Sequence, residues 1–231
     1  MIWFDPMYFV VIGPGLLLSI WASIKVKSTF KKYSRVGIAA GLTGAQVAKE
    51  LLRRRNIRGV QVKAHEGWLS DHYDPRTRVV NLSPDVYNGQ SISAVGVAAH
   101  ECGHAIQHAE GYAPMALRQN LVWPANLGTW LSYVVIIVGA LLAFKGLIWL
   151  GIILFGVVVL FQLVTLPVEF NASSRARRYL VAEGIVTAEE DVHVGKVLGA
   201  AAMTYVAALI TSILTLLYYV MRFTGGGRSD D

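Results

Sequence analysis

The chain has 231 residues, of which 54% are apolar and 16% are charged. About a quarter of the residues of an average soluble domain are charged, so this balance argues against an ordinary soluble protein and favours a membrane protein. A single cysteine excludes an intrachain disulfide framework, and the meaning of the net charge of +6 depends on where the basic residues lie.

The first apolar segment, Met7–Ile24, is long enough to cross roughly 30 Å of hydrocarbon. Asp5 precedes it where a cleaved signal peptide would carry basic residues, and Lys25 and Lys27 follow it. This order of charges predicts an uncleaved anchor with its N-terminus outside.

The polar segment that follows is predicted to be a small α+β region. Its expected elements are a helix from Thr43 to near Asn56, strands at Val60–Val62 and Arg78–Leu82 with a turn-rich loop at His65–Thr77 between them, and a helix from Ser91 or Ser93 through Ile106.

The second of these helices contains the sequence HECGH, in which His100 and His104 stand four residues apart. On an α-helix that spacing places both imidazoles on one face, where they can bind one Zn²⁺ at about 2.0–2.1 Å. Glu101 is rotated by about 100° from His100, so it is better placed to act as general base on a zinc-bound water than to be a ligand. The motif predicts one catalytic zinc ion, and the alternative is a polar helix beside a membrane.

A catalytic zinc needs a third protein ligand, and His108 is the nearest candidate in the sequence. It shares the helical face of His104 but lies about 12 Å along the axis from His100, too far for one straight helix to wrap all three around one ion. We therefore expect His108 to support the site, to face the substrate or to lie at an interface.

Three more apolar segments follow, at Leu127–Phe144, Leu147–Leu166 and Val197–Met221. Of the 21 Lys and Arg, fourteen lie between Lys25 and Arg118 and four between Arg175 and Lys196. Four crossings place these two regions on the same side, which the positive-inside rule makes cytoplasmic. The prediction is a multi-pass protein of the cell membrane with both termini outside and the active site in the cytoplasm.

The preferred third ligand is Glu169, which follows the third apolar segment on the same side as the two histidines. Thr165 and Pro167 are expected to start a helix there. Two histidines and a glutamate are a standard catalytic zinc set, and Glu183 and Asp191 in the same segment are the alternatives.

Three stretches carry a family resemblance: DHYDPRTRVVNLS, GVAAHECGHAIQH and LPVEFNASSRA. Together they resemble the YugP-like neutral zinc metallopeptidases, small bacterial membrane proteins, over most of the chain. A more distant similarity is to the HtpX-type gluzincin membrane peptidases, in which HExxH is followed by ExxAD. The resemblance implies a zinc site made by His100, His104 and Glu169, with Glu101 catalytic.

Ser173 occupies the position of the aspartate of ExxAD. That acid is expected to orient a ligand histidine, and a serine brings no charge, so Asn171 and Asp71 are alternative supports. A zincin also needs a donor to the developing oxyanion. By residue type the candidates are His65, His72, His193 and Tyr205.

These observations predict a mainly α integral membrane protein with four transmembrane helices and a small zincin-like α+β cytoplasmic segment that carries the HExxH helix. The predicted divisions are an anchor at 1–24, the zincin-like segment at 25–124, a transmembrane hairpin at 125–166, a cytoplasmic segment with the third ligand at 167–196, a C-terminal transmembrane helix at 197–222 and a disordered tail at 223–231.

The predicted function is a zinc metalloendopeptidase that hydrolyses peptide bonds of membrane or membrane-proximal proteins at the cytoplasmic face. Its expected partners are a peptide or membrane-protein substrate and the lipid bilayer, with no nucleic acid. The alternatives are a catalytically silent zinc-binding scaffold and a lipid-binding or transport protein. Transporters usually place polar groups within the membrane, and the four apolar segments contain few.

Overall fold

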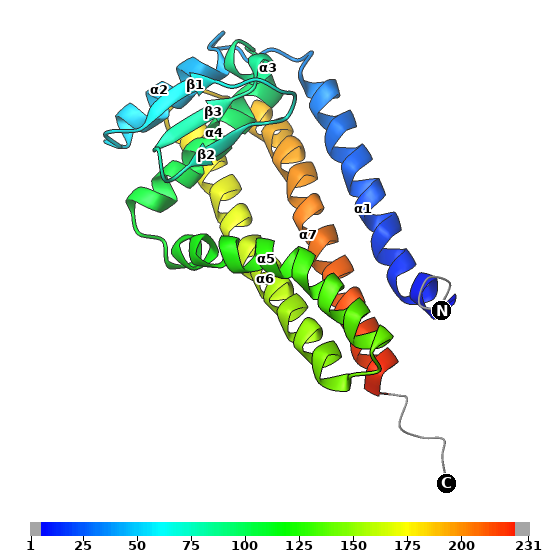
Figure 1. Ribbon diagram of the computed structural model, residues 1–231. Coiled ribbons are helices and arrows are strands. Elements are labelled where there is room, and N and C mark those ends of the chain that lie inside the picture. The colour runs from blue at the N-terminus through cyan, green and yellow to red at the C-terminus, as the bar shows by residue number, and fades with distance from the viewer. Residues whose placement is uncertain (1–5, 225–231) are drawn as a thin grey trace. The chain divides into compact units, whose positions relative to one another are not determined.

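The structure is a computed structural model that describes residues 6–224, and it is mainly helical (Figure 1). Its elements in chain order are α1 (Pro6–Tyr33), α2 (Gly44–Arg54), β1 (Gln61–Ala64), β2 (His72–Asp74), β3 (Val79–Leu82), α3 (Pro84–Tyr87), α4 (Ile92–Ala109), α5 (Ala113–Leu141), α6 (Lys145–Ala182) and α7 (Ala188–Thr224).

The chain divides into two compact units. Within the described residues, the first comprises 6–22, 117–166 and 204–224, and is called the helical unit here. The second comprises 23–116 and 167–203, and is called the mixed unit because it contains both helices and the sheet. Each unit is therefore assembled from separate stretches of the sequence.

The helices α1, α5, α6 and α7 are long and apolar enough to cross a membrane. In the helical unit many large apolar side chains face outward, among them Leu17, Trp130 and Ile153, which are 69%, 68% and 64% exposed. Lipid can solvate such a surface and water cannot, because hydrocarbon chains are as apolar as these side chains.

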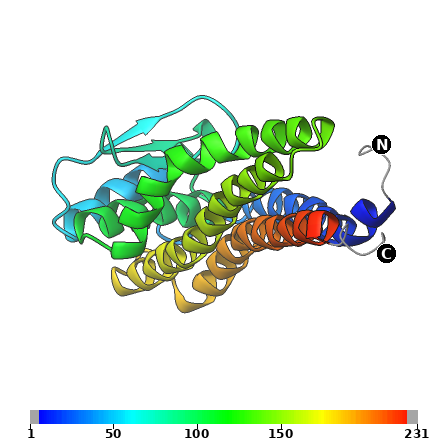
Figure 2. The same ribbon diagram turned by 60° about the horizontal axis from the view of Figure 1, so that its bottom comes forward.

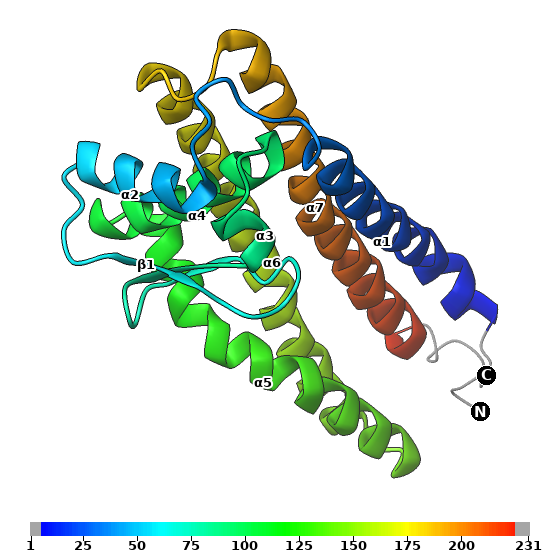
Figure 3. The same cartoon turned by 90° about the horizontal axis from the view of Figure 1, so that it is seen from above.

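Within the helical unit the helices pack against one another, and side chains of α7 join the contacts between α5 and α6. The α5–α6 hairpin, seen from below in Figure 2, buries a small cluster of Ile136, Ile148 and Ile152. Helices α1 and α7 lie side by side (Figure 3), and the hydroxyls of Ser19 on α1 and Thr211 on α7 are 3.0 Å apart. Gly15 allows this approach, because a Cβ there would lie 2.9 Å from the Thr211 hydroxyl oxygen.

The mixed unit contains a three-stranded sheet in the order β1-β3-β2. Strand β1 runs parallel to β3, with Val62 opposite Val80, and β2 runs antiparallel to it, with Tyr73 opposite Val80. Helix α2 and strand β2 pack against α4. Buried apolar side chains of these elements belong to the larger of the two apolar cores found among the described residues. The predicted fold class is confirmed: a mainly α membrane protein with a small mixed sheet.

Local sequence explains where the helices of the mixed unit start and stop. Thr43 caps α2 through a capping box with Gln46, and Asn56 follows the helix in a left-handed conformation (φ 54°) that asparagine tolerates well. Of the two serines considered for α4, Ser91 is the cap, because its side chain accepts a hydrogen bond from the Ala94 N–H.

Two expectations about local structure were wrong. The stretch His65–Thr77 is not loop throughout, because His72–Asp74 form β2 by pairing with β3, and such a short strand leaves no periodic pattern in the sequence. Thr165 and Pro167 do not start a helix, since α6 continues through Pro167 to Ala182. A helix packed against neighbouring helices can tolerate the loss of the one backbone hydrogen bond that proline removes.

The predicted division of the chain into six segments stays a prediction. Helix α5 begins before the predicted boundary at 124, and α6 continues beyond the one at 166. The predicted disordered tail lies largely outside the described residues, because α7 extends to Thr224 and the description ends there.

Candidate metal centre

Helix α4 carries the HExxH sequence through the centre of the mixed unit. Its apolar face packs into the core, and His104 is buried beside it while His100 is partly buried. Helix α6 approaches α4 closely at Gly103, where a Cβ would lie only 2.7 Å from the Ala172 carbonyl oxygen. This glycine brings the α6 backbone next to the histidine face.

Three of the predicted site residues meet at this approach. The Nε2 atom of His100 lies 3.2 Å from Oε2 of Glu169, and the Nε2 atom of His104 lies 3.5 Å from the same oxygen. One donor atom from each of the three residues lies within 4.8 Å of the others, and among the described residues they form a group able to hold a metal ion.

The spacing of these donor atoms fits zinc. Two ligand atoms bonded to one tetrahedral Zn²⁺ at 2.0–2.2 Å stand about 3.3–3.6 Å apart, close to the two distances given above. Two imidazole nitrogens and a carboxylate oxygen also match the donor set of catalytic zinc sites, which leave one position for water. Neither alternative third ligand joins the group: Glu183 binds Arg54 and Arg55, and Asp191 binds Arg177.

Glu101 is buried next to the ligand group but does not belong to it. The pKa of its carboxyl is raised to about 7, mainly because burial disfavours the charged form. His100 opposes this shift, whereas the negative charges of Glu169 and Asp71 add to it. A carboxyl group whose pKa lies near neutral pH can both accept and return a proton, as general acid–base catalysis requires.

Each histidine of the group has its other ring nitrogen supported by a neutral side chain. The Ser173 hydroxyl lies 3.1 Å from Nδ1 of His100, so this predicted support contacts a ligand candidate directly. Gln107 Oε1 lies 3.0 Å from Nδ1 of His104. Sequence reasoning missed Gln107, although its position three residues after His104 on a helix is the signal that could have identified it.

The two other predicted supports make different contacts. Asn171 accepts a hydrogen bond from the side chain of Gln107. Asp71 accepts hydrogen bonds from the backbone N–H and the hydroxyl of Ser83, and burial raises its pKa.

The remaining candidates lie outside the ligand group. His108 Nδ1 is 2.8 Å from the Tyr73 hydroxyl on β2, next to α4. His72 is bound to the Ser70 carbonyl and to Asn81, with the His65 ring against it. His193 packs on Tyr33, and Tyr205 belongs to α7 within the helical unit.

Comparison with known proteins bears on the whole chain. Residues 8–224 match the family described as "putative neutral zinc metallopeptidase". The chain belongs to this family. The chain is also 50% identical over 221 residues to "Putative membrane protease YugP" of Bacillus subtilis (strain 168), covering 95% of this chain and 98% of the relative. No solved structure matches.

Membership of this family identifies a zinc peptidase in general and a multi-pass membrane protein, and it agrees with the four apolar helices and the His-His-Glu group. The resemblance predicted from the three sequence stretches is thereby confirmed.

Proposed function

We propose that the protein is a zinc-dependent endopeptidase that cleaves membrane or membrane-proximal proteins, with His100, His104 and Glu169 as zinc ligands and Glu101 as the catalytic residue. The observation that carries the proposal is the meeting of three donor atoms at zinc-like spacing beside the buried carboxyl group of Glu101. The HExxH assignment as a gluzincin is part of the proposal.

Held by His100, His104 and Glu169, a zinc ion would supply a Lewis acid able to polarise the scissile carbonyl and lower the pKa of a water molecule. Glu101 takes the proton of the attacking water and passes it to the leaving amine, so one carboxyl group serves as base and then as acid. The water oxygen forms a new bond to the carbonyl carbon, the C–N bond then breaks as the nitrogen takes the proton from Glu101, and the products are a carboxylic acid and an amine. Burial of Glu101 keeps this proton at the site.

Strand β2 offers a route for presenting the substrate. It is an edge strand of the sheet and packs against α4, next to the HExxH residues. An extended peptide can add to such an edge through backbone hydrogen bonds. This arrangement favours cleavage of an unfolded or extended stretch, whose backbone N–H and C=O groups are free to pair with the edge.

The sharpest test is Glu101→Gln, which keeps the shape of the side chain and removes its ability to carry a proton. Hydrolysis of a reporter protein should fall by about 10²–10⁴-fold, and the zinc content of the purified protein should stay unchanged. The matched control is Glu189→Gln, the same change at an exposed position of the mixed unit, which should leave activity intact.

The outcomes separate this function from its alternatives. Full activity in Glu101→Gln would contradict the peptidase assignment. Zinc without hydrolysis in the wild type would favour the silent scaffold. His104→Ala and Glu169→Ala should each lower the bound zinc, and zinc contents equal to the wild type in both would refute the site.

The proposed orientation places the mixed unit in the cytoplasm and both termini outside. Cys102 is buried and is the chain's single cysteine, so Glu66→Cys in an exposed loop provides one reactive thiol. A membrane-impermeant thiol reagent should label it only after the cells are opened. Labelling in intact cells would reverse the orientation.

A further inference from the structure

Gln107 is a fully buried polar side chain, with 0% of its surface exposed, in the last turns of α4. Its amide makes three hydrogen bonds: Oε1 with His104 Nδ1 at 3.0 Å, and Nε2 with the Val168 carbonyl and with Asn171 Oδ1 at 2.9 Å each. Buried amides are rarely satisfied so fully by chance, because each unmet group costs free energy.

These partners determine which way the amide faces. A backbone carbonyl can only accept, so the group facing Val168 must be the NH₂ of Gln107. The oxygen therefore faces His104, and since an amide oxygen can only accept, Nδ1 of His104 must carry the hydrogen. In a neutral imidazole this leaves the Nε2 lone pair free, and Nε2 is the atom that faces Glu169.

The other histidine lacks such control. Its Nδ1 contacts the Ser173 hydroxyl, which can donate or accept. Either tautomer of His100 is therefore compatible with Ser173. Of the two histidines, His104 alone has a neighbour that fixes the tautomer required for binding a metal through Nε2.

Gln107 also holds the helix that supplies the third ligand. Val168 and Asn171 flank Glu169 on α6. The NH₂ group of Gln107 binds both and thereby fixes the position of Glu169 along the axis of α4. Asn171 is itself held by Arg175, whose guanidinium binds Glu110 at the end of α4. The contacts form a closed circuit between the two helices.

We infer that Gln107 is the positioning residue of the metal centre, setting both the tautomer of His104 and the register of Glu169. The inference rests on the proposed zinc site. It assigns the support of His104 to a neutral amide on the same helix, while Ser173, at the position of the HtpX-type acid on the second helix, contacts His100.

The main test is Gln107→Met, which keeps the length of the side chain and removes its hydrogen bonds. The control is Ser93→Ala, which removes another buried hydrogen bond of α4, to the Phe30 carbonyl, far along the helix from the histidines. Zinc affinity, measured by competition with a chelator, should fall by about 10–100-fold in Gln107→Met. It should stay within about two-fold of the wild type in Ser93→Ala, although both variants lose thermal stability.

The tautomer provides a readout that requires neither zinc nor activity. In metal-free wild-type protein, ¹⁵N chemical shifts should show His104 protonated at Nδ1, and Gln107→Met should show a mixture. Gln107→Glu should keep the Nδ1–H form, because a carboxylate still accepts from it. Its second oxygen would face two acceptors on α6, so zinc binding should still be weaker than in the wild type.

Equal zinc affinities in wild type and Gln107→Met, or a wild-type His104 that carries hydrogen at Nε2 and none at Nδ1, would overturn the inference while leaving the zinc site standing. A wild type that binds no zinc would instead defeat the proposed function. If Gln107→Met does not fold, Asn171→Ala replaces it: this variant removes one α6 anchor of Gln107, and an unchanged zinc affinity would likewise overturn the inference.

Discussion

The helical and mixed units place their apolar side chains in opposite ways. The helical unit exposes Leu17, Trp130 and Ile153 and buries a cluster of three isoleucines. The mixed unit buries a much larger set, including Val47, Leu82 and Ile106, which surrounds the HExxH helix. The outward-facing apolar side chains of the helical unit suit a lipid environment, whereas the mixed unit carries its own apolar core.

The polar contacts of the two units also differ: several of those in the mixed unit connect separate elements, and several of those in the helical unit stay within one helix. In the mixed unit they form connected groups, such as the Gln107 circuit and the ion pairs around Glu183. In the helical unit several hydroxyls bond a carbonyl one turn back on their own helix, as Thr215 does with Thr211. Such local bonds satisfy a hydroxyl in an apolar medium and link no second element.

Metal removal should produce the largest difference between the two units. If zinc binds His100, His104 and Glu169, it stabilises the mixed unit by about 4 kcal/mol when free zinc exceeds the dissociation constant 1,000-fold. A chelator should therefore increase amide hydrogen exchange in α4 and in α6 around Glu169. Exchange in α5 of the helical unit should stay unchanged, and equal acceleration in both units would show that they do not respond separately.

A lysine scan at exposed apolar positions should give the next largest effect. Ile153 on α6 is 64% exposed in the helical unit, and Val192 on α7 is 53% exposed in the mixed unit. Ile153→Lys should cost about 2.5–3.5 kcal/mol of membrane insertion, because a charge near the middle of a lipid-facing helix loses its water. Val192→Lys should change stability by less than about 0.5 kcal/mol.

Insertion efficiency in membranes and thermal melting in detergent measure these two effects. Equal tolerance of both lysines would contradict the assignment of the helical unit to lipid, since two positions of similar exposure would then face similar solvents.

The same contrast explains what the sequence alone could predict. The apolar segments and the i, i+4 histidines were predictable because each depends on periodicity or length within one stretch. Glu169 could be proposed because membrane topology limits which distant residues share a side with His100. These inferences required no knowledge of side-chain orientation.

Gln107 and β2 depend on information that sequence patterns lack. The role of Gln107 arises because the Val168 carbonyl faces it from another helix, and no local pattern encodes that direction. Strand β2 has only three residues and exists through pairing with β3. Pro167 was wrongly predicted to start a helix for a related reason, since tertiary neighbours decide whether a helix tolerates proline in its interior.

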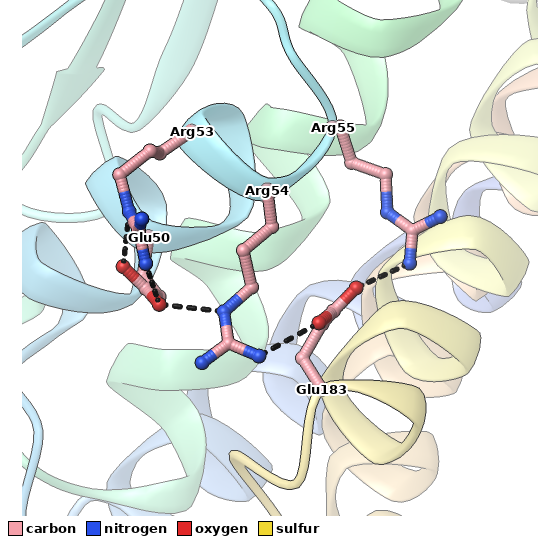
Figure 4. Close-up of polar contacts among 5 residues, drawn as sticks. All are labelled: Glu50, Arg53, Arg54, Arg55 and Glu183. Atoms are coloured by element: carbon pink, nitrogen blue, oxygen red, sulfur yellow. Dashed lines mark hydrogen bonds and ion pairs between the residues drawn. The ribbon is translucent and has the colours of Figure 1, made fainter.

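The smallest predicted effect concerns the arginine cluster of the mixed unit. Glu183 receives hydrogen bonds from Arg54 and Arg55, while Glu50 binds Arg53 and Arg54 (Figure 4). These pairs link α2 to the end of α6, so the run of three arginines is engaged within the protein. Glu183→Gln should lower the melting temperature slightly at low salt, and the difference should vanish near 1 M salt because exposed ion pairs are screened.

The pH dependence of this difference has a definite sign. The hydrogen bond from Arg54 is the largest cause that lowers the pKa of Glu183 below its ordinary value of 4.5. A carboxyl whose pKa is lowered by folding stabilises the folded state above its unfolded pKa and loses that contribution as the pH falls. Melting of wild type and Glu183→Gln should therefore differ at pH 7 and converge as the pH falls below 4.5 and through the lowered pKa of Glu183. Glu189→Gln, at an exposed position of the same unit, is the control. A gap that persists in acid would mean that Glu183 acts through packing instead of charge.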